Sequence, residues 1–109
     1  MKREIKEAWL RALKSGEYEQ GELHLEKDLK YCCLGVLCKV LNQDPKEETV
    51  VTGAELLSKA TLSEIGLSHT EQETLSKMND GGYFNGMKLA KHNFIEIANY
   101  IEYNIKGEV

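Results

Sequence analysis

The sequence predicts an α+β fold that is mostly helical, with a small antiparallel β-hairpin between the first helix and a buried central helix. Apolar residues recur at steps of three and four near both ends of the chain, which is the period of an amphipathic helix. Residues 31–38 read YCCLGVLC, an apolar run that suits a buried element. The stretch before this run mixes apolar and turn-forming residues, which indicates short strands. Given a length of 109 residues, a single domain over 1–109 is expected.

The first helix is expected over residues 2–14, where the apolar residues at helical spacing are Ile5, Ala8, Trp9, Ala12 and Leu13. Ser15-Gly16 then ends it. The next stretch, EYEQGELHLEKDLKY, has turn signals at Gly21 and at Lys27-Asp28. Short strands around these turns would form the small hairpin.

The central helix is expected over residues 32–42 and is apolar nearly all round, as a buried helix is. Its cysteines lack the Cys-x2-4-Cys pairs of zinc sites, and three is an odd number for a disulfide framework. A second alternative to a core role for these cysteines is a catalytic thiol at the start of the helix. Since free cysteine behaves as a small hydrophobe, we interpret the run as core and expect Cys33 and Cys38 to be buried and unreactive. Gly35 is expected to permit another element to approach closely.

The second half contains several helix-start patterns. Residues 42–51 are expected to be a polar loop with a short strand at 49–51, because they contain the only proline. Thr52 and Glu55 form a capping-box pattern for a helix over 53–60. The same pattern at Thr70 and Glu73 predicts a helix that ends near Met78. Residues 79–93 are rich in Asn, Asp and Gly at their start and are expected to form a loop.

The last helix is expected to begin at Asn93, with Glu96 completing its cap, and to end at Lys106-Gly107. Its apolar stripe consists of Phe94, Ile97, Ala98, Ile101 and Ile105. With Tyr100 and Tyr103 on a neighbouring face, this helix has more apolar surface than one small core needs. We therefore expect a homo-oligomer in which this helix or the central one meets its copy across a two-fold axis.

Composition and motifs exclude several classes of function. The chain has no phosphate-binding loop, nucleophile elbow or zinc-protease motif, so no enzyme activity, cofactor or metal is expected. Its net charge of −4 argues against a general nucleic-acid binder. A membrane span is not expected because no apolar run approaches the ~20 residues needed. The N-terminal residues contain no signal-peptide pattern, so the expected location is the cytoplasm.

Two segments contain residue types that suit a small anion. In the first helix, Trp9 could stack on a base while Arg11 binds a phosphate. In the 79–93 loop, glycines expose backbone N–H groups, and the expected ligand-binding side chains are Tyr83, Phe84, Lys88 and Lys91. The alternative is that Trp9 is core, the lysines are solvated and the loop is a plain connection.

The chain also carries a family resemblance, in Trp9, SGEYEQ at 15–20, YCCLGVLC at 31–38, NDG at 79–81 and the helix pattern of 94–102. Together these segments resemble a widespread group of small phage and prophage proteins that has no agreed activity. The similarity spans nearly the whole chain, and YCCLGVLC is its most specific part. The stretch between Asp80 and Phe94 is longer here than in many members.

The resemblance implies a phage or prophage accessory protein that works in the host bacterial cytoplasm. Small phage proteins without catalytic motifs often inhibit host defence, and one class, the sponges, are oligomers that sequester nucleotide second messengers. The expected ligand is therefore a small anionic nucleotide, such as a cyclic dinucleotide or a cyclic ADP-ribose-like molecule. The alternative is a protein–protein inhibitor of a host defence factor that binds through the acidic hairpin, and a small DNA-binding regulator is third.

Overall fold

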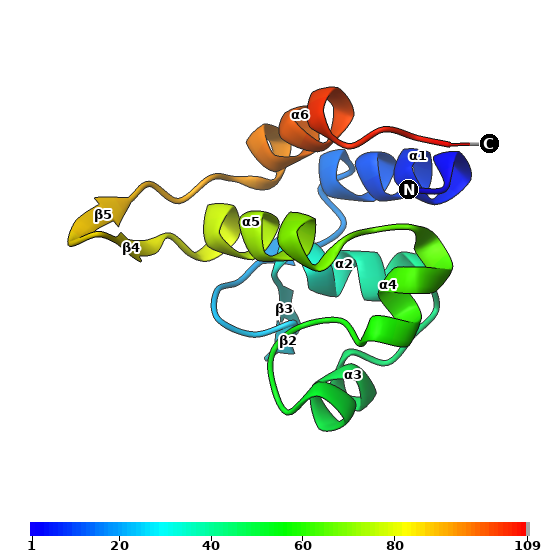
Figure 1. Cartoon of the computed structure of the whole chain (residues 1–109), viewed down its shortest axis with the longest axis horizontal. Coiled ribbons are helices and arrows are strands. Elements are labelled where there is room, and N and C mark those ends of the chain that lie inside the picture. Colours follow the sequence, from blue (N-terminus) through cyan, green and yellow to red (C-terminus); the bar gives the residue numbers. More distant parts are fainter. Residues whose placement is uncertain (109) are drawn as a thin grey trace.

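The computed structural model describes residues 1–108 and, within them, every side chain except that of Phe84. The elements follow the order α1–β1–β2–β3–α2–α3–α4–α5–β4–β5–α6. Four helices form the body: α1 (Arg3–Lys14), α2 (Cys33–Val40), α5 (His69–Asp80) and α6 (Phe94–Asn104). Helix α2 packs between α1 and α5, and α6 lies across α1 (Figure 1). The predicted mostly helical α+β fold is confirmed.

Helix α2 is the centre of the core. Every residue from Cys33 to Cys38 is buried, so the interpretation of YCCLGVLC as core is confirmed. Gly35 has the expected role, because a Cβ atom at this position would lie 1.8 Å from the carbonyl oxygen of Leu25. The chain before β2 therefore crosses α2 in direct contact with its backbone, and the Leu25 side chain is itself fully buried.

Along the chain, a small three-stranded sheet follows α1 and precedes α2, and its strand order is β1-β3-β2. Its strands are β1 (Glu19–Gln20), β2 (Glu26–Lys27) and β3 (Lys30–Tyr31). Strands β2 and β3 form the predicted antiparallel hairpin, with its turn at 28–29. The expected turn at Gly21 does not join two neighbouring strands, because β3 lies between β1 and β2 in the sheet. Strand β1 runs parallel to β3.

The predictions for residues 42–60 are wrong. Residues 45–52 form helix α3 (Pro45–Thr52), whose first turn is capped by the Asp44 side chain, and not a loop with a strand at 49–51. The expected helix over 53–60 does not form, because Thr52 ends α3 and Gly53 adopts the left-handed conformation of a C-cap. Helix α4 (Lys59–Ile65) begins later, after Ser58.

Helix α5 exists but begins two residues earlier than expected. Its capping box is formed by Ser68 and Glu71, whereas Thr70 lies inside the first turn. The final helix begins with the predicted Asn93–Glu96 capping box. Its isoleucines at 97, 101 and 105 are buried in the chain's own core, whereas Ile95 and Tyr103 of the same helix are exposed at 49% and 84%. The homo-oligomer itself stays a prediction.

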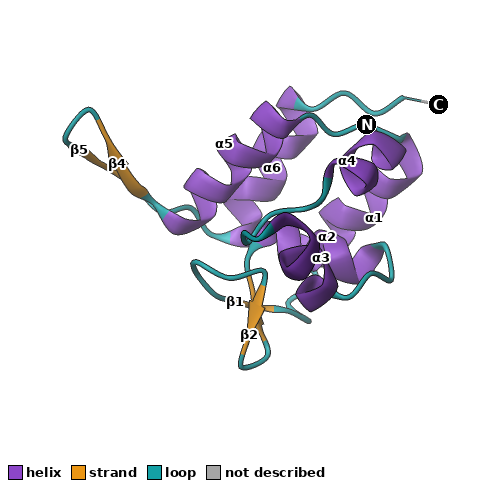
Figure 2. Cartoon of the chain, turned by 60° about the horizontal axis from the view of Figure 1, so that its bottom comes forward, coloured by secondary structure: helices purple, strands orange, loops and turns teal. Residues whose placement is uncertain are grey.

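Residues 82–89 are not a loop but an antiparallel hairpin, formed by β4 (Gly82–Phe84) and β5 (Met87–Leu89). Its two turn residues, Asn85 and Gly86, have φ angles of 50° and 79°. Asn-Gly is the preferred pair for such a turn, so the sequence holds a local signal for this hairpin that the loop-like composition obscures. The hairpin, here called the β4–β5 arm, projects away from the helical body (Figures 1 and 2).

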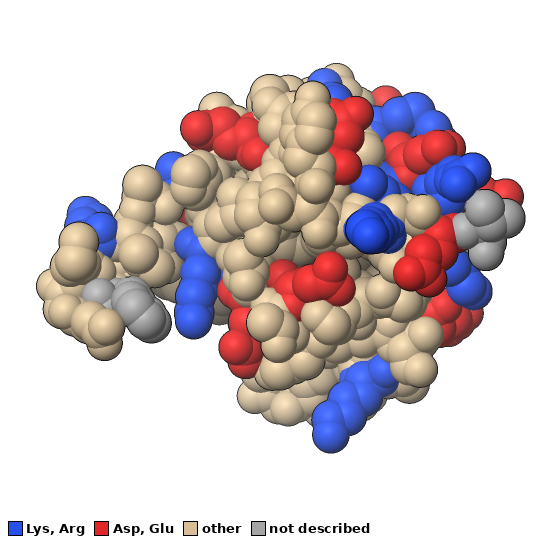
Figure 3. Space-filling view, turned by 45° about the horizontal axis from the view of Figure 1, so that its top comes forward, with Lys and Arg blue, Asp and Glu red and all other residues tan. Residues whose placement is uncertain are grey.

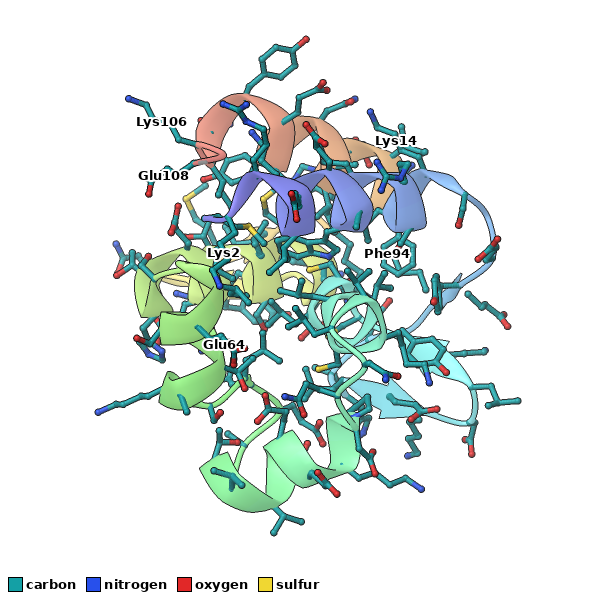
Figure 4. The ribbon with its side chains drawn as sticks, turned by 90° about the vertical axis from the view of Figure 1, so that its right-hand side faces the viewer. Lys2, Lys14, Glu64, Phe94, Lys106 and Glu108 are labelled. Atoms are coloured by element: carbon teal, nitrogen blue, oxygen red, sulfur yellow. The ribbon has the colours of Figure 1, made fainter. Side chains whose placement is uncertain are left out.

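The two ends of the described chain lie together. Lys2 and Glu108 form an isolated parallel bridge, in which the Arg3 N–H donates to the Glu108 carbonyl at 2.8 Å. The Lys2 N–H donates to the carbonyl of Ile65 at the end of α4. Figure 4 shows Lys2, Glu108 and Glu64 at this junction. Among the described residues, none of the helices is long and apolar enough to span a bilayer.

Candidate functional site

The structure separates the residues that were expected to bind an anion. Trp9 is fully buried, and its indole N–H donates to the carbonyl of Cys33 at 2.9 Å. It therefore has no exposed face for a ligand, and the expectation of a stacking indole is corrected. Arg11 is exposed on α1 and does not belong to the β4–β5 arm.

The other expected residues lie on or near the arm. Tyr83 and Lys88 face each other across its two strands, and the Tyr83 side chain is 75% exposed. Lys91 lies at the base of the arm, where its Nζ is 2.7 Å from a carboxylate oxygen of Glu22. The Phe84 side chain lies outside the described part of the chain. The structure thus brings Tyr83 and Lys88 together but engages Lys91 in an ion pair.

A second exposed region has a less common backbone. We call residues 21–30 the leucine loop, because Leu23 and Leu29 are its exposed apolar residues, at 66% and 76%. Their φ angles are 67° and 62°, and that of Asp28 is 53°. The left-handed region costs an L-residue roughly 1–2 kcal/mol, and among non-glycine residues mainly Asn and Asp adopt it. Two exposed leucines in this conformation are therefore a sign that the loop is maintained by other contacts.

Those contacts come from side chains distant in sequence. The Leu23 N–H donates to a carboxylate oxygen of Asp80 at 3.0 Å. The Asn79 amide donates to the Gly21 carbonyl at 2.8 Å, and its oxygen accepts the Cys33 N–H at the start of α2. The C-terminal end of α5 thus fixes the first half of the loop.

Glu55 fixes the middle of the loop. One carboxylate oxygen accepts the Leu25 N–H at 3.0 Å and the hydroxyl of Thr49 at 3.1 Å, and the other is 3.0 Å from His24 Nδ1. Burial raises the pKa of this carboxyl, but the hydrogen bonds from Leu25, His24 and Thr49 outweigh burial and leave the pKa below its ordinary value. The ionised carboxylate is therefore the form that binds the loop.

A recess of about 170 Å³ lies within the loop, lined by Gly21, Glu22, His24, Lys27, Asp28 and Lys30. Lys27 and Lys30 face each other across β2 and β3. Three of the lining residues have ionic partners: Glu22 pairs with Lys91, His24 contacts Glu55, and Lys30 lies 3.8 Å from Glu19. The recess is small and its wall carries both signs of charge.

The cysteines do not contribute to this region. Cys33 and Cys38 are fully buried, as expected. Burial raises the pKa of Cys38 to about 12 and that of Cys32 to about 11, and it also raises the pKa of Cys33. Thiolates would be scarce at neutral pH, which supports the prediction that these thiols are unreactive. Within residues 1–108, no three His, Cys, Asp or Glu side chains gather as a metal site would require.

Basic and acidic side chains are interspersed on the face of the molecule that Figure 3 shows. The strongest local imbalances are in sequence segments. Residues 15–30 hold five acidic residues and two lysines, a balance of −3, whereas residues 81–95 hold two lysines and no acidic residue. The leucine loop is therefore on an acidic segment, and the arm is on a basic one.

Sequence reasoning connects the acidic hairpin with the alternative function, protein inhibition, but it does not single out Leu23 and Leu29 as exposed. The apolar residues Leu23, Leu25 and Leu29 all looked like strand residues, although only Leu25 is buried. No local pattern distinguishes an inward leucine from an exposed one with positive φ. The residues that determine the difference, Glu55, Asn79 and Asp80, lie 30 to 59 positions away from their partners.

Comparison with known proteins gives a family but no function. Residues 1–60 match the family model described as a domain of unknown function, DUF8296. No curated protein and no solved structure matches the chain. The matched segment includes α1, the three-stranded sheet, α2, α3 and Glu55, and hence the whole leucine loop. Since it covers more than half of the 109 residues, the chain belongs to the DUF8296 family of domains of unknown function.

Proposed function

We propose that this protein acts by binding another protein and performs no chemistry of its own. The observation that carries the proposal is the position of its exposed apolar side chains. Leu23 and Leu29 lie on the leucine loop, and Tyr83 and Met87 lie on the projecting arm, each at least 66% exposed, whereas the other exposed large apolar side chains lie on helices α3 and α6. Large apolar side chains grouped on exposed loops and hairpins commonly mark protein interaction sites.

The resemblance to small phage and prophage proteins gives this proposal a direction. In that setting the partner is a host protein, and binding inhibits it. A nucleotide ligand stays a prediction, and the structure lends it little support: Trp9 is buried, Arg11 lies on α1 and not on the arm, and Lys91 is paired with Glu22. The arm retains one cation beside one described aromatic ring, Lys88 beside Tyr83.

Affinity capture from a bacterial extract tests the proposal. The bait is the full chain, and its matched variants are Leu23→Ser/Leu29→Ser on the loop and Tyr83→Ser/Met87→Ser on the arm. A third variant, Val50→Ser/Val51→Ser, changes equally exposed residues on α3 and is the control. We expect a host protein that is captured stoichiometrically by the wild type and lost with at least one of the first two variants but retained by the control.

A thermal-shift panel of cyclic nucleotides provides the opposite outcome. A ligand at a hundred times its dissociation constant stabilises the folded state by about 2.7 kcal/mol, which raises the melting temperature by on the order of 10 °C. Such a shift, together with no captured protein, would replace protein binding with nucleotide sequestration. The absence of both would leave the proposal without its partner and contradict it.

A further inference from the structure

Within the proposed function, on which this inference rests, we propose that the leucine loop is the binding surface. Its partner is a protein segment that combines basic side chains with large apolar ones. Leu23 and Leu29 are the anchors that pack against its apolar side chains. Three features of the loop support this: the backbone conformation of the leucines, the contacts beneath them and the charge around them.

The backbone conformation of Leu29 lowers the stability of the free protein. It is the second residue of a two-residue turn in which both residues have positive φ, and glycine is preferred at that position. The same chain has glycine there in its other hairpin, at Gly86. Leu29 is 76% exposed, so burial within this chain does not compensate for its conformation. An exposed, conformationally costly apolar residue is typical of a functional surface.

The second feature is that the loop is pre-organised. Asp80 and Glu55 accept hydrogen bonds from its backbone and Asn79 donates one to it. The buried Leu25 side chain anchors the centre of the loop, between the two exposed leucines in sequence. A preformed loop loses little conformational entropy when it binds. The structure therefore presents both leucines in a fixed arrangement without help from the partner.

The third feature is charge. Residues 15–30 have a balance of −3, and the two acids that contact the loop from other elements, Glu55 and Asp80, add to it. Lys30 pairs with Glu19, and Lys91 from the base of the arm pairs with Glu22, so two of these acids are offset. Lys27 is the cation of this segment without an ionic partner among the described residues. Asp28 is likewise unpaired among them. An acidic rim around apolar anchors complements a basic partner and repels nucleic acid.

A selection experiment with a defined probe tests the inference. The probe is a displayed library of random 16-residue peptides, selected on the immobilised full chain and counter-screened on Leu29→Gly and Leu23→Gly variants. We expect enriched peptides that combine Lys or Arg with large apolar residues. Either glycine variant should weaken their binding at least ten-fold, and raising the salt from 50 to 300 mM should weaken it several-fold.

The matched control is Tyr83→Ser on the arm, which should leave peptide binding unchanged. Melting temperatures equal to or above that of the wild type would show that the glycine variants are folded. Peptides that bind Leu29→Gly as well as the wild type, or that are acidic, would overturn the inference. If Tyr83→Ser removes the binding instead, the protein-binding proposal stands but the loop is not the site. If wild type is dimeric by light scattering and Leu29→Gly is monomeric, the occupant is a second copy and the foreign partner is excluded.

Discussion

The two antiparallel hairpins of this protein have turns of the same geometry but different residues. The arm closes with Asn85-Gly86 and the β2–β3 hairpin with Asp28-Leu29, and all four residues have positive φ. In the arm, the residues of the turn prefer this conformation, so no contact with the body is needed to form it. In the leucine loop, the second turn residue disfavours it, and distant side chains maintain the structure.

The difference shows two ways in which a short chain can shape a surface. The arm obtains its shape from local sequence, and its packing on the body is confined to its base. The loop obtains its shape from α2, α5 and Glu55, so its geometry depends on the completed fold. We therefore expect changes in the core to reach the loop and to leave the arm largely unaffected.

The largest effect is expected for Gly35→Ala. The added Cβ would meet the Leu25 carbonyl oxygen at 1.8 Å, and a backbone atom cannot move aside by changing rotamer. We expect a loss of about 3 kcal/mol or more in the free energy of unfolding, despite a gain of about 1 kcal/mol in helix propensity. Urea unfolding measures it. Gly16→Ala, where no atom lies within 4 Å, should cost only about 1 kcal/mol for its positive φ, and equal losses would contradict the explanation.

The second effect is expected for Asn79→Ala. Asn79 is buried, and its amide connects Gly21, Gln20, Cys33 and Asp80 by hydrogen bonds. Its removal leaves buried polar groups unpaired and should cost about 2–3 kcal/mol. Hydrogen exchange should rise in the loop more than in the arm. Asn104→Ala is the control, because this exposed residue makes one bond, to Tyr100; a comparable loss there would count against a special role for Asn79.

The third effect is expected when the second turn residues of the two hairpins, Leu29 and Gly86, are exchanged. Leu29→Gly removes the left-handed cost of leucine but adds the conformational freedom of glycine to the unfolded chain. We expect a net gain of about 0.5–1 kcal/mol. Gly86→Leu should lose about 1 kcal/mol or more for the opposite reason. Thermal unfolding measures both, and a Leu29→Gly protein less stable than the wild type would show that Leu29 contributes packing that its exposure does not reveal.

The smallest effect concerns pH. The Glu55 pKa lies below its ordinary value of 4.5 in the folded protein, so the unfolded chain binds the proton more readily. Stability from Glu55 is therefore present above pH 4.5 and is lost as the pH falls through the lower folded pKa. Glu55→Gln should lose under about 1 kcal/mol at pH 7, since the group is partly exposed, and should show a flatter decline below pH 4.5. An unchanged acid profile, relative to wild type and to Glu4→Gln, would contradict this linkage.

The sequence predicts those parts of the fold whose signals are local. The stripe and capping box of α6 and the apolar run of α2 gave correct elements, because helix period and burial act within a few residues. Asp44-Pro45 is a valid start signal for α3, because proline suits the first position of a helix. The same proline also suits a loop, which is why composition alone predicts one here. The capping pattern of Thr52 and Glu55 starts no helix, because Thr52 is the last residue of α3 and Gly53 ends that helix.

The candidate site was less predictable than the fold. The arm has a recognisable Asn-Gly signal, so its hairpin could have been found. The exposed leucines of the loop could not, because their conformation depends on hydrogen bonds to Asp80 and Glu55 that only the folded chain brings close. Sequence alone leaves both interpretations of Trp9 open for a related reason: an indole suits a ligand or a core equally well, and its partner, the Cys33 carbonyl, lies 24 residues away.

The bridge between Lys2 and Glu108 has a consequence for chain order. Because the two ends lie side by side next to α4, a short linker could join them without disturbing the core. New ends could then be opened between Asn85 and Gly86, at the tip of an arm that projects from the body. Such a circular permutant would begin at β5 and α6, continue through α1 and α2, and finish at α5 and β4. It would retain every helix contact and the leucine loop while dividing the arm into two separate tails.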